Sequence, residues 1–304
     1  MKILQRILTA VLVGVIFFFL ARSLIVNWTQ IPFTELRFNT LYIIISFLCL
    51  VVYFSLLTRG WSSIVAELGS KVPYGKAFWI VSTSQIAKYV PGGIWYTVGR
   101  VYLARTEKVK EEIGLVSVVF ETLLLMLTNL VIFLISVNFI RGNTHLSPFL
   151  SVAFIVVILI LLYPPLLNML LNLGLRIIKK PAVKLQARYL SILKVSMYFF
   201  VLWLAQIAGY YFLINSIYPI GVSQLPNLAT AYTLSWITGF IVLFAPGGLG
   251  VREGMMTLLL SSILPLPLAI AISFITRVWI TIFEVLIFFA GLVIRRKTKT
   301  RTAP

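Results

Sequence analysis

Aspartate is absent from this 304-residue chain, and its eight acidic residues are all glutamates. Cysteine and histidine occur once each, as Cys49 and His145. A single cysteine excludes an internal disulfide and a cysteine-cluster metal site, and one histidine without aspartate offers no set of metal ligands. The sequence also contains no Ser-His-Asp set, P-loop or dinucleotide-binding loop. We therefore expect no metal, no cofactor and no catalytic activity.

Charged residues of any kind are scarce, at 11% of the chain, whereas hydrophobic residues make up 60%. Apolar runs of about 20 residues, the length that crosses the hydrocarbon core of a bilayer, recur along the sequence. The longest stretch suited to water, about residues 174–194, is too short to fold as a module. The pattern predicts a single all-α polytopic membrane domain over residues 1–304.

The charges that do occur are mostly positive, with 26 Lys and Arg and a net charge of +18. They gather in the stretch 176–194, in the loop from Arg59 to Lys76, and at both ends of the chain. Cytoplasmic loops carry such an excess, so we place these parts and both termini in the cytoplasm, with loops 141–148 and 218–227 outside. Anionic lipid headgroups also suit this charge. Nucleic acid is not an expected partner, because no basic soluble module is present.

Apolar runs bounded by charge, proline and glycine predict six full spans, at about 7–26, 40–58, 113–140, 149–171, 195–217 and 268–294. We take the first as an uncleaved helix rather than a signal peptide, because Ala21-Arg22-Ser23 is a poor cleavage site. Two further apolar segments, residues 74–104 and 228–264, are each split into short halves by a Pro-Gly-Gly sequence.

The splits occur in "YVPGGIWYTVGR" and "LFAPGGLGVREG", whose prolines, Pro91 and Pro246, are 155 positions apart. The charge distribution requires each split segment to enter and leave on the same side, so each is predicted to be a hairpin, either re-entrant or made of two short spans. The order span, hairpin, span then occurs twice, over about 40–140 (repeat one) and 195–294 (repeat two), and the linking span at 149–171 inverts the second copy. Inverted repeats with paired broken helices are typical of transporters that bind substrate near the membrane midplane.

Broken helices persist inside a bilayer only where their free backbone groups face protein or a water-filled cavity. Proline ends a helix, and paired glycines let a ligand approach the backbone. The free N–H groups and dipole of the helix after each break suit an anion. We therefore predict that Gly92, Gly93, Gly247 and Gly248 contribute to a site for a phosphate.

Seven charged residues lie in or beside the hairpins and spans: Lys88, Arg100, Glu121, Arg252, Glu253, Arg277 and Glu284. Charged side chains inside a membrane cost roughly 2.5–3.5 kcal/mol each on insertion scales and are usually functional. We predict that the four cations bind substrate, and that the three glutamates pair with them or carry a coupling proton. The alternative is a structural role, in which ion pairs such as Arg277–Glu284 or Arg252–Glu121 hold helices together.

The stretches "KYVPGGIWYTVGR", "FET", "FAPGGLGVREGMMTLLL" and "FITRVW" resemble the transmembrane domain of the lysylphosphatidylglycerol synthase family, the flippase-like domain of the multiple peptide resistance factor. The resemblance covers about residues 5–295, and "APGGLGVREG" is its most specific part. It implies a bacterial or archaeal inner-membrane protein that moves or presents a lipid with an anionic headgroup. It places all of the seven charged residues except Glu284 at motif positions of the family.

The resemblance also implies limits and partners. The soluble aminoacyl-transfer domain of the full-length factor does not follow in this sequence, so lipid aminoacylation is not expected. Stand-alone relatives often accompany glycosyltransferases, which makes a polyprenyl-phosphate-linked sugar a candidate substrate.

The function we expect is a lipid flippase that carries a phospholipid or polyprenyl-phosphate-linked glycan across the cytoplasmic membrane by alternating access. One alternative is a non-catalytic membrane partner of a glycosyltransferase, for which the stretch 174–194 would matter more than the intramembrane charges. The other is an intramembrane enzyme acting on a lipid phosphate, for which the sequence offers only glutamates and one loop histidine as reactive groups.

Overall fold

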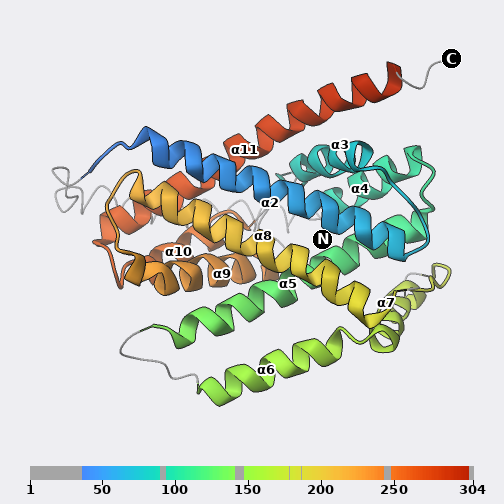
Figure 1. Ribbon diagram of the computed structural model, residues 1–304, viewed down its shortest axis with the longest axis horizontal. Coiled ribbons are helices and arrows are strands. Elements are labelled where there is room, and N and C mark those ends of the chain that lie inside the picture. Colours follow the sequence, from blue (N-terminus) through green and yellow to red (C-terminus); the bar gives the residue numbers. More distant parts are fainter. Residues whose placement is uncertain are drawn as a thin grey trace, which may run out of the picture.

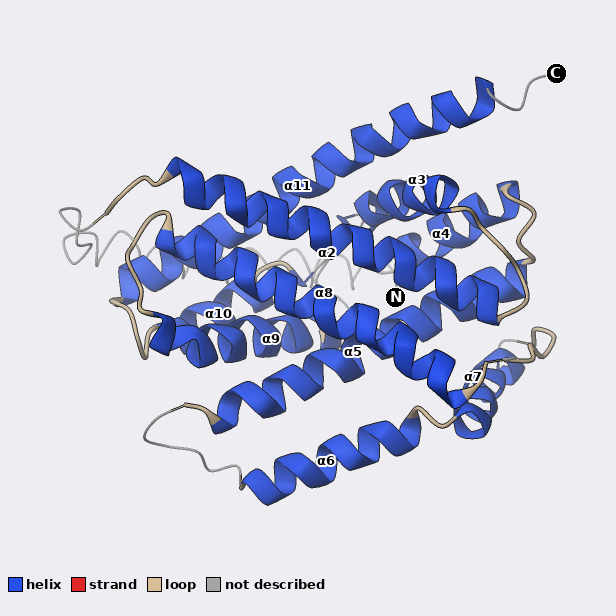
Figure 2. Ribbon diagram, in the orientation of Figure 1, coloured by secondary structure: helices blue, strands red, loops and turns tan. Residues whose placement is uncertain are grey.

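The computed structural model describes residues 36–89, 94–140, 147–177, 179–185, 187–242 and 248–300, with side chains described as far as residue 296. Over these ranges the chain forms ten α-helices and two short 3-10 helices, and no strand (Figure 2). The predicted all-α class is therefore confirmed.

Four of these helices are long and apolar enough to cross a membrane: α2 (Thr40–Glu67), α5 (Glu111–Asn138), α8 (Tyr189–Asn215) and α11 (Leu266–Thr300). They coincide with four of the predicted spans. The predicted span at 7–26 lies outside the described residues. Many large apolar side chains of the four long helices, such as Leu41, Leu48 and Phe289, are exposed, as expected for helices that face lipid.

Short helices flank each Pro-Gly-Gly sequence. In repeat one these are α3 (Tyr74–Gln85), the 3-10 helix η2 (Ile86–Tyr89) and α4 (Trp95–Thr106); in repeat two they are α9 (Leu225–Ile241), preceded by η3 (Val222–Gln224), and α10 (Val251–Leu260). Helix α3 contacts α4, and α9 contacts α10, so each segment folds back on itself instead of continuing in one direction. The residues of the breaks themselves, 90–93 and 243–247, lie outside the described ranges.

The apolar run predicted as a single span at 149–171 forms two helices instead. Helix α6 (Pro148–Leu161) and helix α7 (Pro164–Ile177) are bent by 72° at the break between them. Pro164 and Pro165 follow Tyr163 directly, and a residue before proline is pushed out of the helical conformation, so the first helix ends here. Figure 1 shows α7 at one end of the bundle, turned across the direction of α6.

Helices of the two predicted repeats make matching contacts. Helix α3 packs against α11, and its counterpart α9 packs against α5. Helix α4 contacts α5, just as α10 contacts α11. The two first helices, α2 and α8, run alongside each other through the middle of the bundle (Figure 1). Exchanging equivalent helices thus maps one set of contacts onto the other.

The contact between α2 and α8 depends on a small residue. A methyl group placed at Gly209 of α8 would lie 3.0 Å from the Ser46 carbonyl oxygen and 3.1 Å from the ring of Trp279. Small residues allow close backbone approach between membrane helices, which is where van der Waals packing stabilises them.

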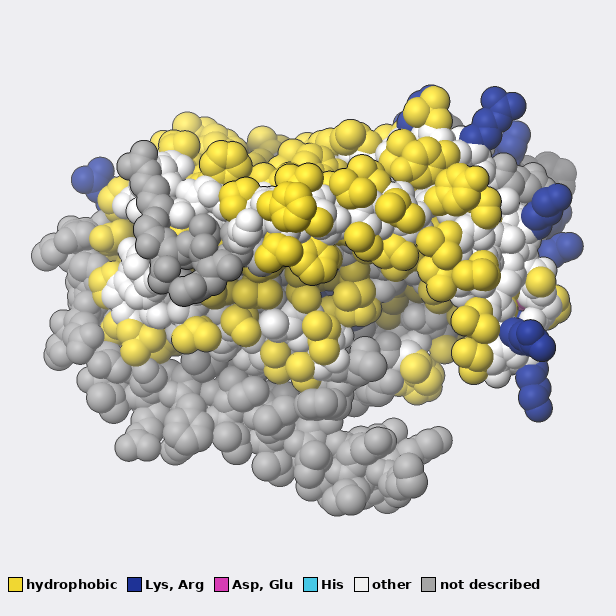
Figure 3. All heavy atoms as spheres, turned by 90° about the horizontal axis from the view of Figure 1, so that it is seen from below, with side chains coloured by type: hydrophobic (Ala, Val, Ile, Leu, Met, Phe, Trp, Pro, Cys, Tyr) yellow, Lys and Arg dark blue, Asp and Glu magenta, His cyan; other side chains and the backbone are white. Residues whose placement is uncertain are grey.

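The cations of the loops gather at one end of the bundle. Figure 3 shows most of the visible Lys and Arg side chains at one end of an otherwise largely apolar face. The end of α2, the start of α5 and helix α7 lie at this end in Figure 1, whereas the loop between α8 and α9, which has no charged residue, lies at the other.

Candidate functional site

Among the charged residues predicted from the sequence, three ion pairs join the split segments to α5 and α11. Arg100 of α4 pairs with Glu121 of α5 at 2.7 Å, and Glu253 of α10 pairs with Arg277 of α11 at 3.7 Å. In each predicted repeat, the pair joins the second helix of the split segment to the span that follows it. The cation lies on the split segment in the first pair, on α4, and on the span in the second pair, on α11. The third pair, Lys88 with Glu284, crosses between the repeats, from η2 to α11.

Arg100 and Glu121 form the most enclosed pair, since neither side chain is exposed to any measurable extent. The guanidinium donates from Nε to Ser84 Oγ at 2.6 Å and from Nη2 to the Tyr96 hydroxyl at 2.7 Å. It also lies over the ring of Trp61, 5.5 Å from its centre. With its donor groups engaged on three sides, Arg100 is held as a fixed structural cation.

Lys88 and Glu284 are joined by a hydrogen bond as well as by charge. The second carboxylate oxygen of Glu284 accepts a hydrogen bond from the Tyr89 hydroxyl at 2.7 Å, and that hydroxyl also lies 3.1 Å from Thr281 Oγ1. Glu284 is buried, whereas the Lys88 side chain keeps about 26% of its surface exposed. The lysine end of this pair therefore stays accessible to a competing anion.

Glu253 has two functions at the start of α10. Its Oε2 accepts a hydrogen bond from the Gly250 N–H at 2.6 Å, which caps the helix, while Oε1 faces the Arg277 guanidinium. Gly250 has a φ of 80°, a conformation that glycine adopts without strain. One of the N–H groups predicted to attract an external anion is thus occupied by a carboxylate of the chain.

Arg252 differs from the other three cations. Among the described residues it takes part in no ion pair, although its Nε is buried. Its side chain extends over the ring of Trp236, 5.5 Å from the centre, and passes between Gly239 and Gly248. A methyl group would lie 2.7 Å from the Arg252 Nε if placed at Gly239 and 2.8 Å if placed at Gly248, and Gly248 also has a φ of 71°. A side chain at either position would therefore displace Arg252.

A cavity of about 200 Å³, here called the central cavity, is lined by residues of both split segments. The residues that line it are Tyr53, Leu57, Gln85, Lys88, Tyr96, Thr122, Leu125, Trp236, Gly239, Phe240, Val242, Gly248 and Arg252. Each split segment thus contributes one cation, Lys88 or Arg252, and α2 and α5 contribute mostly apolar and aromatic surface. Such a lining suits a molecule that has both a negative charge and an apolar part.

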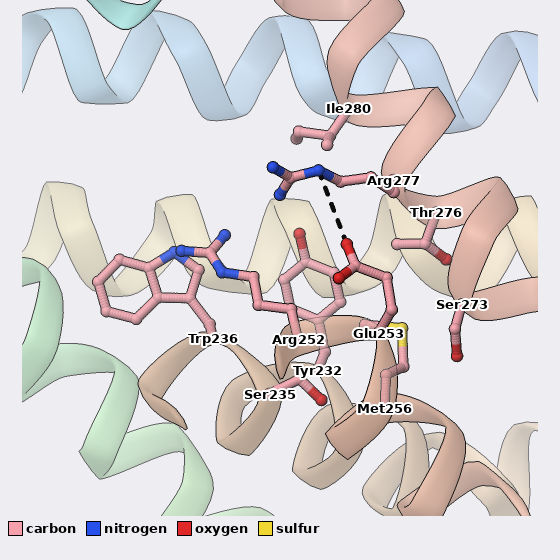
Figure 4. A pocket seen from close by; sticks show the side chains of 10 residues that line it. All are labelled: Tyr232, Ser235, Trp236, Arg252, Glu253, Met256, Ser273, Thr276, Arg277 and Ile280. Carbon is pink, nitrogen blue, oxygen red and sulfur yellow. Dashed lines mark ion pairs between the residues drawn. The ribbon is translucent and has the colours of Figure 1, made fainter. Parts of the chain in front are cut away.

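A smaller space of about 40 Å³, the side pocket, lies next to it and shares Trp236 and Arg252 with the central cavity. Figure 4 shows Arg252 stretched beside Trp236, with the Arg277 side chain approaching Glu253 from α11. Ser235, Ser273 and Thr276 also line it, and each donates its hydroxyl to a backbone carbonyl of its own helix. One water needs about 10–15 Å³, so the pocket has room for a few water-sized groups.

The structure brings most of the predicted site residues together, but in other pairs than the sequence suggested. Glu284 pairs with Lys88, not with Arg277, and Glu121 pairs with Arg100, not with Arg252. Of the predicted cations, Lys88, Arg252 and Arg277 line the cavity or the side pocket, whereas Arg100 lines neither. Gly92, Gly93 and Gly247 lie outside the described residues.

Several residues around the cavity were not predicted. Tyr89, Tyr96 and Gln85 stand close to the charged positions in sequence, but nothing in their spacing sets them apart from ordinary packing residues. Trp236 is one of seven tryptophans, and nothing in the sequence distinguishes it from the others. Gly239 lacks a neighbouring proline, so only the three-dimensional contact with Arg252 reveals it.

Comparison with known proteins places this arrangement in a family. A sequence profile of the lysylphosphatidylglycerol synthase TM region matches residues 7–287. The chain belongs to this family. The resemblance noted from the Pro-Gly-Gly stretches is thereby confirmed, and the lysylphosphatidylglycerol synthase TM region covers both hairpins, the central cavity and the side pocket. No curated protein matches the chain.

Proposed function

We propose that this protein transports a lipid with an anionic headgroup across the cytoplasmic membrane of a prokaryote by alternating access, and that it is not an enzyme. The headgroup enters the central cavity between the hairpins, while its acyl or polyprenyl chains stay in the bilayer. A phospholipid and a polyprenyl-phosphate-linked glycan share the phosphate that the site would bind.

The unpaired cation at the cavity is the observation that carries this proposal. A guanidinium within a membrane domain is costly unless an anion or water compensates it. Lys88, Arg252 and Arg277 face two carboxylates, those of Glu253 and Glu284, which leaves one positive charge in excess. Arg252 has the planar donor geometry that suits a phosphate, and Trp236 and the two glycines fix its position.

The architecture supports alternating access. The contacts of repeat one map onto those of repeat two, as expected for two copies of one unit. Fold-back of α3 on α4 and of α9 on α10 supports two hairpins, and placing the cation-rich end in the cytoplasm gives the two copies opposite orientation. With the predicted span at 7–26 and a span that begins with α6, the proposed topology has six spans and both termini inside.

The proposal is tested by comparing the wild type with Arg252→Ala. Lipids that co-purify with each are identified by mass spectrometry, and movement of a fluorescent phosphatidylglycerol across reconstituted vesicles is measured. We expect an anionic lipid class to be enriched in the wild type and lost in Arg252→Ala, together with transport. Arg37→Ala is the control and should keep both, because Arg37 is an exposed cation that precedes α2, contacts the loop after α8 and does not line the cavity.

Full transport by Arg252→Ala would contradict the site. Bulk lipid in both preparations, together with function that survives replacement of Lys88, Arg252 and Arg277, would instead favour a scaffold that assembles with a glycosyltransferase. Turnover of a lipid phosphate by the purified protein would favour an enzyme.

A further inference from the structure

Helix α7 lies across the end of the bundle where the cations gather. It makes an angle of 72° with α6, and Figure 1 shows it at the end of the bundle, turned across α6 and the long helices. Because those helices run in the direction in which the chain crosses the membrane, α7 lies near the plane of the membrane surface. This position does not depend on whether the protein transports lipid.

Two tyrosines mark the depth of the bend. Tyr163, between α6 and α7, packs edge-to-face against Tyr189 at the start of α8, with ring centres 6.3 Å apart. The Tyr189 hydroxyl donates to the carbonyl oxygen of Leu159 at 3.0 Å, which ties α8 to the last turn of α6. Tyrosine is enriched where membrane meets water, so the bend is expected at headgroup level.

Helix α7 presents apolar side chains on two sides. Leu167, Leu171 and Leu175, each four positions from the next, are buried against the bundle. On the outer side, four large apolar residues are exposed: Met169 59%, Leu170 40%, Leu173 54% and Ile177 75%. An outer apolar face on an in-plane helix is the arrangement by which helices settle into the boundary between headgroups and acyl chains.

The cations that follow α7 are held beside this face. Two asparagines of the helix fix the returning chain: Asn172 exchanges hydrogen bonds with the backbone of Val183, at 2.8 and 2.9 Å, and Asn168 Oδ1 accepts from the Leu185 N–H at 3.1 Å. Lys180 pairs with Glu111 at 3.0 Å, which anchors the turn to α5. These contacts hold the segment after α7 in place against α7 and α5.

Four further cations of this segment are exposed: Arg176, Lys179, Lys184 and Arg188. None of them forms an ion pair with a carboxylate of the described residues. The stretch 174–194 contains no acid. The exposed apolar face of α7 matches the acyl layer of an anionic leaflet. The cations beside it, which no carboxylate neutralises, match the layer of charged headgroups.

We infer that α7 and the segment after it, residues 164–188, form an interfacial site that selects anionic phospholipids in the leaflet at the cation-rich end. The exposed side chains of α7 enter the acyl layer, and Arg176, Lys179, Lys184 and Arg188 contact the phosphates. This site is separate from the central cavity, since it shares no lining residue with it.

The test uses the full chain, with a fluorescent label on the outer face of α7. Cys49 is the only cysteine, so a Cys49→Ala, Leu173→Cys variant accepts one label at this face. The variant is placed in phosphatidylcholine vesicles with or without phosphatidylglycerol, and one of the two lipids carries brominated acyl chains that quench the label. We expect brominated phosphatidylglycerol to quench more strongly than brominated phosphatidylcholine at equal mole fraction.

The double substitution Lys184→Gln, Arg188→Gln should remove the preference. Each cation near an anionic surface changes the affinity by about fivefold, so the pair should lower the apparent affinity for phosphatidylglycerol by roughly 25-fold. High salt should weaken the preference in the unsubstituted protein. Arg37→Gln is the matched control at the opposite end, and a label at Phe154 of α6 should show no preference between the lipids.

Equal quenching by the two lipids would overturn the inference, because it would mean apolar contact without headgroup selection. Absence of quenching by either lipid would overturn it as well, because a protein partner or water would then cover α7. Loss of transport in Arg252→Ala has no bearing on either outcome.

Discussion

Replacing Gly239 with alanine should move Arg252 without touching its charge. The new methyl group would lie 2.7 Å from Nε of Arg252, closer than real Cβ atoms approach other heavy atoms, and 3.0 Å from its Cδ. The arginine is flexible and the backbone of α9 is not, so the side chain must leave its place between Gly239 and Gly248. The variant therefore tests the position of the charge, whereas Arg252→Ala tests its presence.

The effects on stability and on binding should separate. Overpacking costs typically about 1–3 kcal/mol, but alanine in a helix gains up to about 1 kcal/mol over glycine, so the net loss of stability should be small. A misplaced guanidinium loses its hydrogen bonds to a bound anion, worth about 1.5–3 kcal/mol. This corresponds to a tenfold to hundredfold weaker affinity for an anionic lipid, at 1.4 kcal/mol per factor of ten.

The assay is binding of a fluorescent phosphatidylglycerol to the purified protein, with thermal unfolding measured on the same samples. Gly99→Ala on α4 is the control, because a methyl group there meets only the Cβ of Ala87, at 3.9 Å. Unchanged binding in Gly239→Ala would refute the placement of the phosphate at Arg252. Equal losses in both variants would show that helix flexibility, and not the collision, is responsible.

Three further substitutions test the surroundings of the site. Glu121→Ala leaves Arg100 charged and buried without its partner, so it should lower the free energy of unfolding by about 3–5 kcal/mol, and a melting temperature equal to that of the wild type would contradict the pairing. Glu284→Gln removes the carboxylate that competes for Lys88, so phosphatidylglycerol should bind several-fold more tightly in the same fluorescence assay; weaker binding would mean that the pair only holds α11 in place. Gly209→Ala should push α2 from α8 and destabilise by about 1–3 kcal/mol, measured by thermal unfolding, and a neutral effect would show that this interface can relax.

The sequence predicts where the helices lie better than it predicts which charged side chains pair with one another. Apolar runs and Pro-Gly-Gly breaks locate the long helices and the two split segments, because membrane insertion imposes both on the local sequence. The partners of the charges depend on how separate segments pack. Lys88 and Glu284 are 196 positions apart, and no local rule favours that pair over Arg277 and Glu284, which share a helix.

The bend after α6 was predictable in part. Pro164 and Pro165 are a breaker as strong as either Pro-Gly-Gly, but the apolar run continues through them, and length alone then indicates one span. What the sequence does not show is the direction of the second half. That direction follows from contacts of Leu167, Leu171 and Leu175 with the rest of the chain.

Arg252→Ala and Glu284→Gln are expected to change the affinity for an anionic lipid in opposite directions, and this difference distinguishes a ligand site from a structural charge network. If the cavity cations only held helices together, Arg252→Ala and Glu284→Gln would each remove a tie, and both would weaken the protein without improving any binding. If the cavity receives a phosphate, Glu284 acts as the anion of the chain itself, neutralising Lys88 while the cavity is empty, and Arg252 is the cation left for the ligand. Removing the internal anion should then raise affinity, and removing the unpaired cation should lower it. Only the second arrangement predicts a gain from any single substitution at the cavity, so the Glu284→Gln measurement separates the two.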